Sequence, residues 1–201
     1  KLGIRKAVFG GGCFMNVKAN MRIAQLENLD QVFFMPSSGD ESAAIGSAYK
    51  VHQDHAAVSL SPIEHLYLGP RFTNNEVHTI LSQNAHQVSF EKVDDIEARI
   101  ADLLVDSKII GRFKGHAEWG ARSLGHRSII CRADDLRIIH KLNKAIKMRD
   151  FWMPFAPSIL EEDSERYIIN PKNIAAPFMT INFETTPLAR EHLAAGLHPF
   201  D

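Results

Sequence analysis

The segment Lys108–Cys131, KIIGRFKGHAEWGARSLGHRSIIC, most constrains what this chain can fold into. It begins and ends with short apolar runs typical of β-strands, Ile109–Ile110 and Ile129–Ile130. Between these runs lie four glycines and four cations: Gly111, Gly115, Gly120 and Gly125, with Arg112, Lys114, Arg122 and Arg127. Glycine lets the backbone approach a ligand closely, and guanidinium groups bind phosphate through paired hydrogen bonds. We therefore expect this glycine-cation segment to be two strands that flank an anion-binding loop.

The rest of the chain is not basic. Its 201 residues include 23 Lys and Arg against 24 Asp and Glu, for a formal net charge of -1. The clustered cations therefore indicate a local site rather than a general surface for polyanions. An alternative interpretation stays open: a glycine-rich connection whose arginines pair with nearby acids on a solvated face.

The composition, 45% hydrophobic and 23% charged, is typical of a globular protein of one or two domains. No apolar run approaches the roughly 18–20 residues that span a bilayer, and the N-terminal stretch does not resemble a signal peptide. We expect a cytoplasmic location without a membrane partner. Cys13 and Cys131 are expected to be reduced thiols. His52 and His55 lack the spacing and companion ligands of a zinc site.

A second glycine cluster lies near the N-terminus. Ala7–Phe9 predicts a short strand, Gly10, Gly11 and Gly12 a tight turn, and the apolar spacing over Phe14–Ala24 a helix. The N–H groups at the start of such a helix favour an anion, and the helix dipole adds to this preference. Close backbone packing explains a glycine turn equally well, so the cluster alone does not establish a ligand site.

Polar side chains near this turn are candidates for ligand binding. Asn16 and Asn20 lie one helical turn apart and either line a pocket or face water. The apolar run Val32–Pro36 predicts a strand buried on both faces, followed by a loop and a helix of small residues. Asp40, at the start of that helix, is an N-cap, a metal ligand or a catalytic carboxylate, and its position alone favours the N-cap.

The remaining chain predicts a connection and further helices and strands, which makes the fold class α/β. The connection spans Ala56–Thr73 with a boundary near Phe72, helices are expected over Asn75–Ser82, Val93–Leu104, Leu136–Ile146 and Leu188–Gly196, and strands over Gln87–Phe90, Ser158–Leu160 and Met179–Phe183. Lys147 and Arg149 follow the third of these helices, where the helix dipole alone would favour cations. The aromatic and proline-rich stretch FWMPFAP, which is expected to be rigid and partly apolar, then leads to Ser158.

Five stretches together resemble a known family. In order and spacing, GGGCFMNVKANMRI, PSSGDESAAIGSA, YLGPRF, KIIGRFKGHAEWGARSLGHRSII and LNKAIKMRDFWMPFAPSIL are similar to the O-carbamoyltransferases that include nodulation protein NodU and the enzymes carbamoylating cephamycin and tobramycin. The resemblance implies the end of an actin-like ATPase (ASKHA) domain in residues 1–72 and a YrdC-like α/β domain, incomplete at its C-terminus, in residues 73–201. We therefore expect a fragment of a longer enzyme.

The resemblance also implies an activity. The second domain would join carbamoyl phosphate and ATP, with Mg²⁺, into carbamoyl-adenylate. The first domain of the complete enzyme would pass the carbamoyl group to a hydroxyl of a small acceptor, near a nucleotide and Fe²⁺. Fixed cations suit this chemistry because it brings several negative charges together.

Site residues follow from the matching motifs. The first domain would bind nucleotide through the glycine turn and Asn16, and Asp40 would be a metal ligand, which replaces the N-cap assignment. In the second domain, the resemblance implies a catalytic anion pocket with further binding residues. Its catalytic members would be Arg122, Arg127, Lys147 and Arg149, and its binding members Lys114, Ser128 and Ser158.

Three positions depart from the family pattern. His116 and Met153 stand where the family usually has arginine, and Ala121 stands where it usually has proline. Met153 in place of a cation removes a phosphate contact or an ion pair. Two other classes of function are alternatives: a non-catalytic nucleotide- or RNA-binding module with a YrdC-like fold, and a kinase-like ATPase built on the GGG and SGD motifs. Nucleic acid is not the expected partner, because no stripe of lysines and aromatic residues accompanies the glycines.

Overall fold

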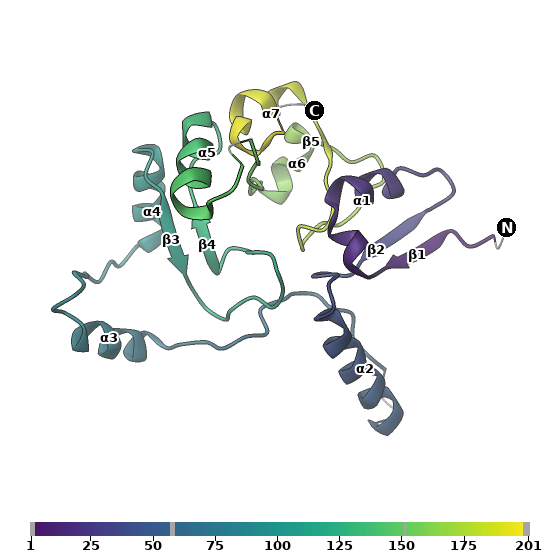
Figure 1. Cartoon of the computed structure of the whole chain (residues 1–201), viewed down its shortest axis with the longest axis horizontal. Coiled ribbons are helices and arrows are strands. Elements are labelled where there is room, and N and C mark those ends of the chain that lie inside the picture. Colours follow the sequence, from purple (N-terminus) through teal and green to yellow (C-terminus); the bar gives the residue numbers. More distant parts are fainter. Residues whose placement is uncertain (1–2, 57–58, 151, 199–201) are drawn as a thin grey trace. The chain divides into compact units, whose positions relative to one another are not determined.

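The computed structural model describes residues 3–56, 59–150 and 152–198 (Figure 1). The chain divides into two compact units, each built from segments that are distant in sequence. The first unit comprises Lys1–Leu66, Trp119–Arg122 and Ser158–Glu191, and the second comprises Tyr67–Glu118, Ser123–Pro157 and His192–Asp201. The domain boundary predicted near Phe72 stays a prediction.

The first unit contains two small sheets with helices. Its elements are β1 (Lys6–Phe9), η1 (Gly12–Met15), α1 (Val17–Ala24), β2 (Gln31–Phe34), α2 (Ser42–Ala56), η3 (Glu161–Asp163), α6 (Ser164–Tyr167), β5 (Ile168–Ile169), β6 (Glu184–Thr185) and α7 (Pro187–His192), whose last residue falls in the second unit. β1 and β2 are parallel, from the pair Lys6 and Gln31 to the pair Phe9 and Phe34, and β5 is antiparallel to β6. The predicted strand, glycine turn and helix at the N-terminus are confirmed.

The β1–β2 sheet is covered on one face. Phe9 and Phe34 stack with ring centroids 5.1 Å apart, and Phe34 is only 5% exposed. Val8 and Phe33, paired on the opposite face, are 76% and 38% exposed. The expectation that the second strand is buried on both faces is therefore wrong, because the described residues cover only the face that carries the aromatic rings.

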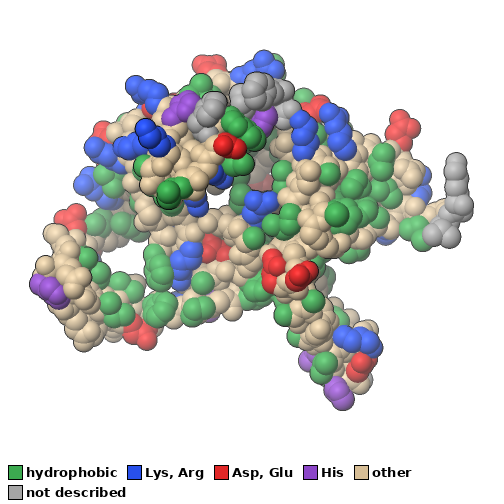
Figure 2. Space-filling view, in the orientation of Figure 1, with side chains coloured by type: hydrophobic (Ala, Val, Ile, Leu, Met, Phe, Trp, Pro, Cys, Tyr) green, Lys and Arg blue, Asp and Glu red, His purple; other side chains and the backbone are tan. Residues whose placement is uncertain are grey.

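Figure 2 shows charged and His side chains around the far end of α2, where His52 and His55 are exposed.

The second unit is organised around a β-hairpin. Its elements are α3 (Asn74–Gln83), α4 (Ile96–Val105), β3 (Ile110–Phe113), β4 (Arg127–Ile130), α5 (Leu136–Leu142), η2 (Asn143–Lys147) and η4 (Ala194–Gly196). β3 and β4 lie side by side and antiparallel, with α4 next to β3 (Figure 1). The two strands predicted to flank the glycine-cation loop are confirmed. Asp95 caps α4 by accepting the N–H of Ala98 at 3.0 Å.

Three predicted strands are wrong. Gln87–Phe90 and Ser158–Leu160 have irregular backbone or turns, and Met179–Phe183 is also irregular, with β6 beginning at the next residue. The N–H groups of Gln87 and Val88 both donate to the carbonyl of Asn84, which closes a turn after α3. Met179 has φ +55°, which a strand does not allow. Short apolar runs alone do not identify a strand, because a strand also needs a partner for its backbone groups.

The observed mixture of helices and small sheets is consistent with the α/β class. Throughout the described ranges, none of the helices combines the length and apolar character needed to cross a membrane.

Candidate functional site

The loop between β3 and β4 is ordered by one carboxylate, Glu118. Its Oε1 atom accepts the backbone N–H groups of Leu124 at 3.0 Å, His126 at 2.7 Å and Arg127 at 3.0 Å. Burial raises the pKa of Glu118, but backbone N–H donors outweigh burial and hold the pKa below its usual 4.5. Sequence reasoning missed this residue. The available signal was that Glu118 is the one acid in the glycine-cation segment.

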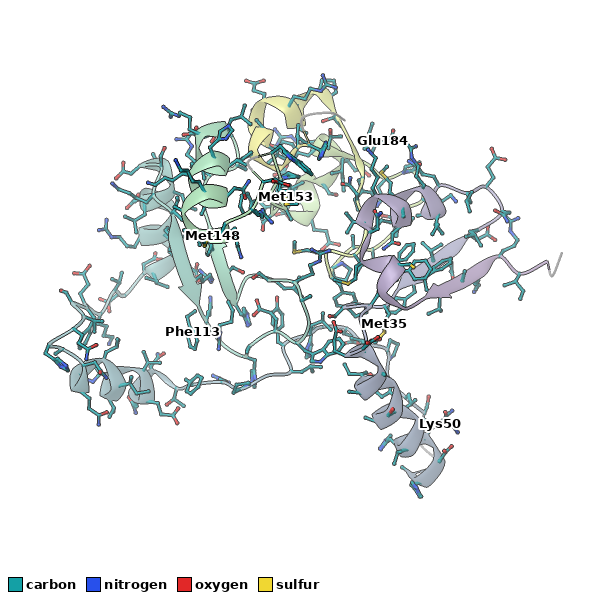
Figure 3. The ribbon with its side chains drawn as sticks, viewed as in Figure 1. Met35, Lys50, Phe113, Met148, Met153 and Glu184 are labelled. Atoms are coloured by element: carbon teal, nitrogen blue, oxygen red, sulfur yellow. The ribbon has the colours of Figure 1, made fainter. Side chains whose placement is uncertain are left out.

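Arg127 is held by the same loop. Its guanidinium donates to the carbonyls of Lys114 at 2.7 Å, Gly115 at 3.1 Å and His126 at 3.2 Å. It also lies 3.5 Å from the ring centroid of Phe113, at the end of β3 (Figure 3). All these partners are neutral, and within the described part of the chain no carboxylate pairs with Arg127. The loop therefore fixes a cation without neutralising its charge.

Two other cations of the segment share one carboxylate partner. Glu97, from α4, forms two 3.0 Å hydrogen bonds with Arg112 and one of 2.7 Å with Lys114. Hydrogen bonds from Arg112 and then Lys114 lower the pKa of Glu97 to about 2. The alternative interpretation, in which cations pair with nearby acids, is therefore correct for Arg112 and Lys114. Ligand binding by Lys114 stays a prediction, and it requires this ammonium to exchange or share its carboxylate partner.

Arg149 lies beyond the C-terminal end of α5. Its Nε donates to Oδ1 of Asn143 at 2.7 Å, one terminal nitrogen lies 3.4 Å from the carbonyl oxygen of Pro154, and its guanidinium is 4.4 Å from the ring centroid of Phe155. Burial lowers the pKa of Arg149. Among the described residues no carboxylate pairs with it. Arg149 is thus a second cation that is fixed by neutral partners.

The other residues predicted for this pocket are divided between the two units. Lys147 is exposed at the end of η2, and the Ser128 hydroxyl accepts the N–H of Gly125 at 2.9 Å, both within the second unit. Arg122 and the exposed Ser158 belong to the first unit, where Arg122 donates to the carbonyl of Met15 at 3.2 Å. The guanidinium groups of Arg127 and Arg149 contact different partners. That both line one anion pocket stays a prediction.

The glycine turn of the first unit is open. Gly10, Gly11 and Gly12 are exposed, and Gly11 has φ +100°, a conformation that favours glycine. Asn16 caps α1: its Oδ1 accepts the N–H groups of Lys18 at 3.2 Å and Ala19 at 3.1 Å. The helix start is therefore partly satisfied by the chain itself, and contact of this turn and Asn16 with nucleotide stays a prediction.

Asn20 neither lines an open pocket nor faces water. It is fully buried, and its Nδ2 donates to the carbonyls of Phe14 at 2.8 Å and Thr180 at 2.6 Å. This amide ties α1 to the segment that sequence reasoning took for a strand. Its role is to hold the first unit together.

The residues around Asp40 do not by themselves fit an iron site. Asp40 is exposed, and its carbonyl accepts the N–H of Ala43 at 3.1 Å. In the part of the chain that the structure describes, no group of three or more His, Cys, Asp or Glu side chains is placed to hold a metal ion. Transition metals in proteins are held by several converging ligands. Asp40 as one ligand of iron stays a prediction.

Two family models match this chain. The model described as "Carbamoyltransferase C-terminus" matches residues 101–201, and the model described as "Carbamoyltransferase N-terminus" matches residues 1–49. The first match includes the β3–β4 hairpin, Glu118, Arg127 and Arg149. The second match includes the glycine turn, Asn16 and Asp40.

Curated relatives align with nearly the whole chain. An uncharacterized protein of Synechocystis is 32% identical over 206 residues, which cover 99% of this chain and 32% of the relative. An uncharacterized protein of Methanocaldococcus jannaschii is 34% identical over 200 residues, covering 97% of this chain and 37% of the relative. Nodulation protein NolO of Bradyrhizobium diazoefficiens is 31% identical over 183 residues, covering 88% and 33%. The chain spans about a third of the length of these relatives.

Proposed function

Because the chain belongs to the carbamoyltransferase family, we propose that it takes part in O-carbamoyl transfer from carbamoyl phosphate, with ATP, to a hydroxyl of a small acceptor. The proposed route passes through carbamoyl-adenylate, formed in the YrdC-like domain of residues 73–201. The actin-like domain, to which residues 1–72 are assigned, would use Fe²⁺ and transfer the carbamoyl group. Cytoplasmic location is part of the same proposal.

The observation that most supports the proposal is the pair of unneutralised guanidinium groups. Arg127 and Arg149 are both fixed by backbone carbonyls or an amide and by an aromatic ring. Both residues are half-buried, and a guanidinium that is partly removed from water is stabilised by a negative partner. In carbamoyl-adenylate formation this partner would be a phosphate group of ATP or carbamoyl phosphate.

The proposed step balances when one water is included. Carbamoyl phosphate, ATP and water give carbamoyl-adenylate, pyrophosphate and inorganic phosphate. Water would first cleave carbamoyl phosphate between its carbamoyl group and its phosphate, giving carbamate and inorganic phosphate. A carbamate oxygen would then bond to the α-phosphorus of ATP as the bond from that phosphorus to the pyrophosphate oxygen breaks. Mg²⁺ bound to ATP would share the phosphate charge. In the second unit, Arg127, Arg149 and Lys147 would hold the remaining negative charge, with Lys114 and Ser128 as other proposed contacts. Ligand contacts of Arg122 and Ser158, which belong to the first unit, stay predictions.

The test measures ATP binding and pyrophosphate release by the purified chain. We expect ATP with Mg²⁺ to bind, and pyrophosphate to form only when carbamoyl phosphate is also present. Arg149→Ala should weaken ATP binding at least about tenfold. The matched control is Arg137→Ala, since Arg137 is 89% exposed and already pairs with Asp135. Absence of ATP binding by the unaltered chain contradicts the proposal.

A nucleotide- or RNA-binding module and a kinase-like ATPase stay predictions. No observation in the described residues favours either function over carbamoyl transfer. Glu97 pairs with both Arg112 and Lys114 and offsets one of their two charges, which lowers the positive charge that the segment offers to a polyanion. RNA binding that persists without any ATP binding would favour the module.

A further inference from the structure

The backbone before Arg149 follows an uncommon path. Helix α5 continues as one π-helical stretch, Asn143–Lys147, and Met148 then takes a left-handed conformation with φ 47° and ψ 49°. The N–H groups of Met148 and Arg149 both donate to the carbonyl of Asn143, the latter at 3.1 Å. π-helical turns and left-handed residues other than glycine persist where surrounding contacts hold them, and they occur often at functional sites. One of the contacts that hold this turn comes from the Asn143 side chain.

The Asn143 side chain is fully buried and uses both ends of its amide. Its Nδ2 donates to the carbonyl of Met153 at 2.9 Å, and its Oδ1 accepts Nε–H of Arg149 at 2.7 Å. Met148 and Met153, labelled in Figure 3, bracket this turn in sequence. One side chain thus fixes the turn and orients the guanidinium at its Nε edge. Among the described residues, the terminal nitrogens of Arg149 make one long hydrogen bond, 3.4 Å to the carbonyl of Pro154, so they keep donors for another partner.

The chemical type of the acceptor matters as much as its position. A carboxylate at position 143 would form an ion pair and neutralise Arg149, whereas the Asn143 amide fixes the guanidinium and leaves its charge. Phe155 adds a cation–π contact at 4.4 Å, which also leaves the charge in place. Arg149 is half-buried and has no carboxylate partner among the described residues, so an anionic ligand would offset the cost of removing part of its guanidinium from water.

We propose that Asn143 is a positioning residue that presents Arg149, with its charge unneutralised, to a phosphate group of the ligand. This inference rests on the proposed function and deepens it, because it assigns a phosphoryl-bearing anion to the Arg149 side of the second unit.

The test uses the substitution Asn143→Asp in the full 201-residue chain. Aspartate keeps the acceptor for Arg149, loses the donor to Met153 and adds the negative charge that the proposal excludes. ATP affinity, measured by calorimetry with Mg²⁺, should fall at least about tenfold while circular dichroism and cooperative unfolding show a folded chain. Asn170→Asp is the matched control, because Asn170 is a half-buried asparagine that bonds the backbone of Ile174 at both ends. We expect ATP affinity to be unchanged in that control.

A double-mutant cycle separates positioning from a purely structural role. If Asn143 acts through Arg149, then Asn143→Asp should cause no further loss of ATP affinity in a chain that already carries Arg149→Ala. Equal losses in both backgrounds, or unchanged ATP affinity in Asn143→Asp, overturn the inference and leave the proposed function standing. ATP binding that does not depend on Arg149 also overturns the inference alone. Failure of the unaltered chain to bind ATP overturns both.

Discussion

The backbone N–H of Arg127 donates a 3.0 Å hydrogen bond to Oε1 of Glu118, nine residues earlier in the chain. The same oxygen accepts the N–H groups of Leu124 and His126, so one carboxylate sets the path by which the loop enters β4. The position of the Arg127 guanidinium depends on that path, because its own acceptors are the carbonyls of Lys114, Gly115 and His126.

Glu118→Ala should lower the free energy of unfolding by about 2–3 kcal/mol, because it leaves several N–H groups without their acceptor. Glu118→Gln keeps a neutral acceptor and should lose about half of that amount. Urea unfolding at pH 7 measures both. Equal stability of the alanine variant and the unaltered chain would show that the loop does not depend on this carboxylate.

Two glycines of the loop provide a comparison of backbone strain with steric overlap. Both have left-handed φ, +102° for Gly120 and +105° for Gly125, so alanine at either should cost about 1–2 kcal/mol from strain. A Cβ at Gly120 would also lie 2.7 Å from Cβ of Ser37, while a Cβ at Gly125 meets open space. We expect Gly120→Ala to cost at least about 1 kcal/mol more than Gly125→Ala. Denaturant unfolding of the two variants checks the difference, and equal losses would contradict the close approach to Ser37.

Glu97 should make stability depend on pH in the acid range. Its pKa is about 2 in the folded chain, below the ordinary 4.5, so the unfolded state binds protons first as the pH falls. The stabilisation is therefore fully present above pH 4.5 and is lost as the pH falls from there towards 2. In Glu97→Gln this part of the pH dependence should disappear.

Unfolding of the Glu97→Gln chain at several pH values checks the prediction. The exposed Glu91→Gln is its control. High salt should reduce the Glu97 effect, since that side chain is 55% exposed. An unchanged difference between the Glu97→Gln and unaltered chains from pH 5 to pH 2 would argue against the ion pair.

Met148 offers a stabilising substitution. Its side chain is 87% exposed and its backbone is left-handed, so Met148→Gly should relieve strain at little cost in contacts. We expect a gain of about 0.5–1 kcal/mol in the free energy of unfolding, measured by denaturant titration. Met148→Ala, which keeps the Cβ, should show no such gain. A gain of equal size in both variants would mean that the side chain rather than the backbone is unfavourable.

Met153 stands where the family pattern has a cation. Its carbonyl accepts Nδ2 of Asn143, and its side chain is half-buried. Met153→Arg should therefore keep the backbone contact and tighten carbamoyl phosphate binding by about 3–10-fold if the surrounding pocket matches the family. Calorimetry measures this affinity, with Met153→Gln as the uncharged control. Unchanged affinity in a folded Met153→Arg chain would indicate that this subsite is arranged differently.

Sequence patterns predicted the elements whose signals are local. The strands on either side of the glycine-cation loop and the strand, turn and helix at the N-terminus all depend on spacing within a few residues. The predicted strand at Met179–Phe183 is wrong because backbone groups of this segment bond to α1 rather than to a neighbouring strand. The carbonyl of Thr180 accepts Nδ2 of Asn20, and the N–H of Asn182 donates to the carbonyl of Val17. Such contacts join residues more than 150 positions apart, and no local pattern encodes them.

By itself, the sequence determined which residue types are available for anion chemistry and which segments become strands and helices, because propensity and periodicity act over one or two turns. Only the tertiary structure decided which cations pair with a carboxylate and which contact neutral groups. Glu97 reaches Arg112 across 15 residues and neutralises it, whereas Arg149 meets the neutral amide of Asn143. The physical reason is that a hydrogen bond or ion pair forms only within a few ångströms, and the distance between groups on different elements is set by how the elements pack.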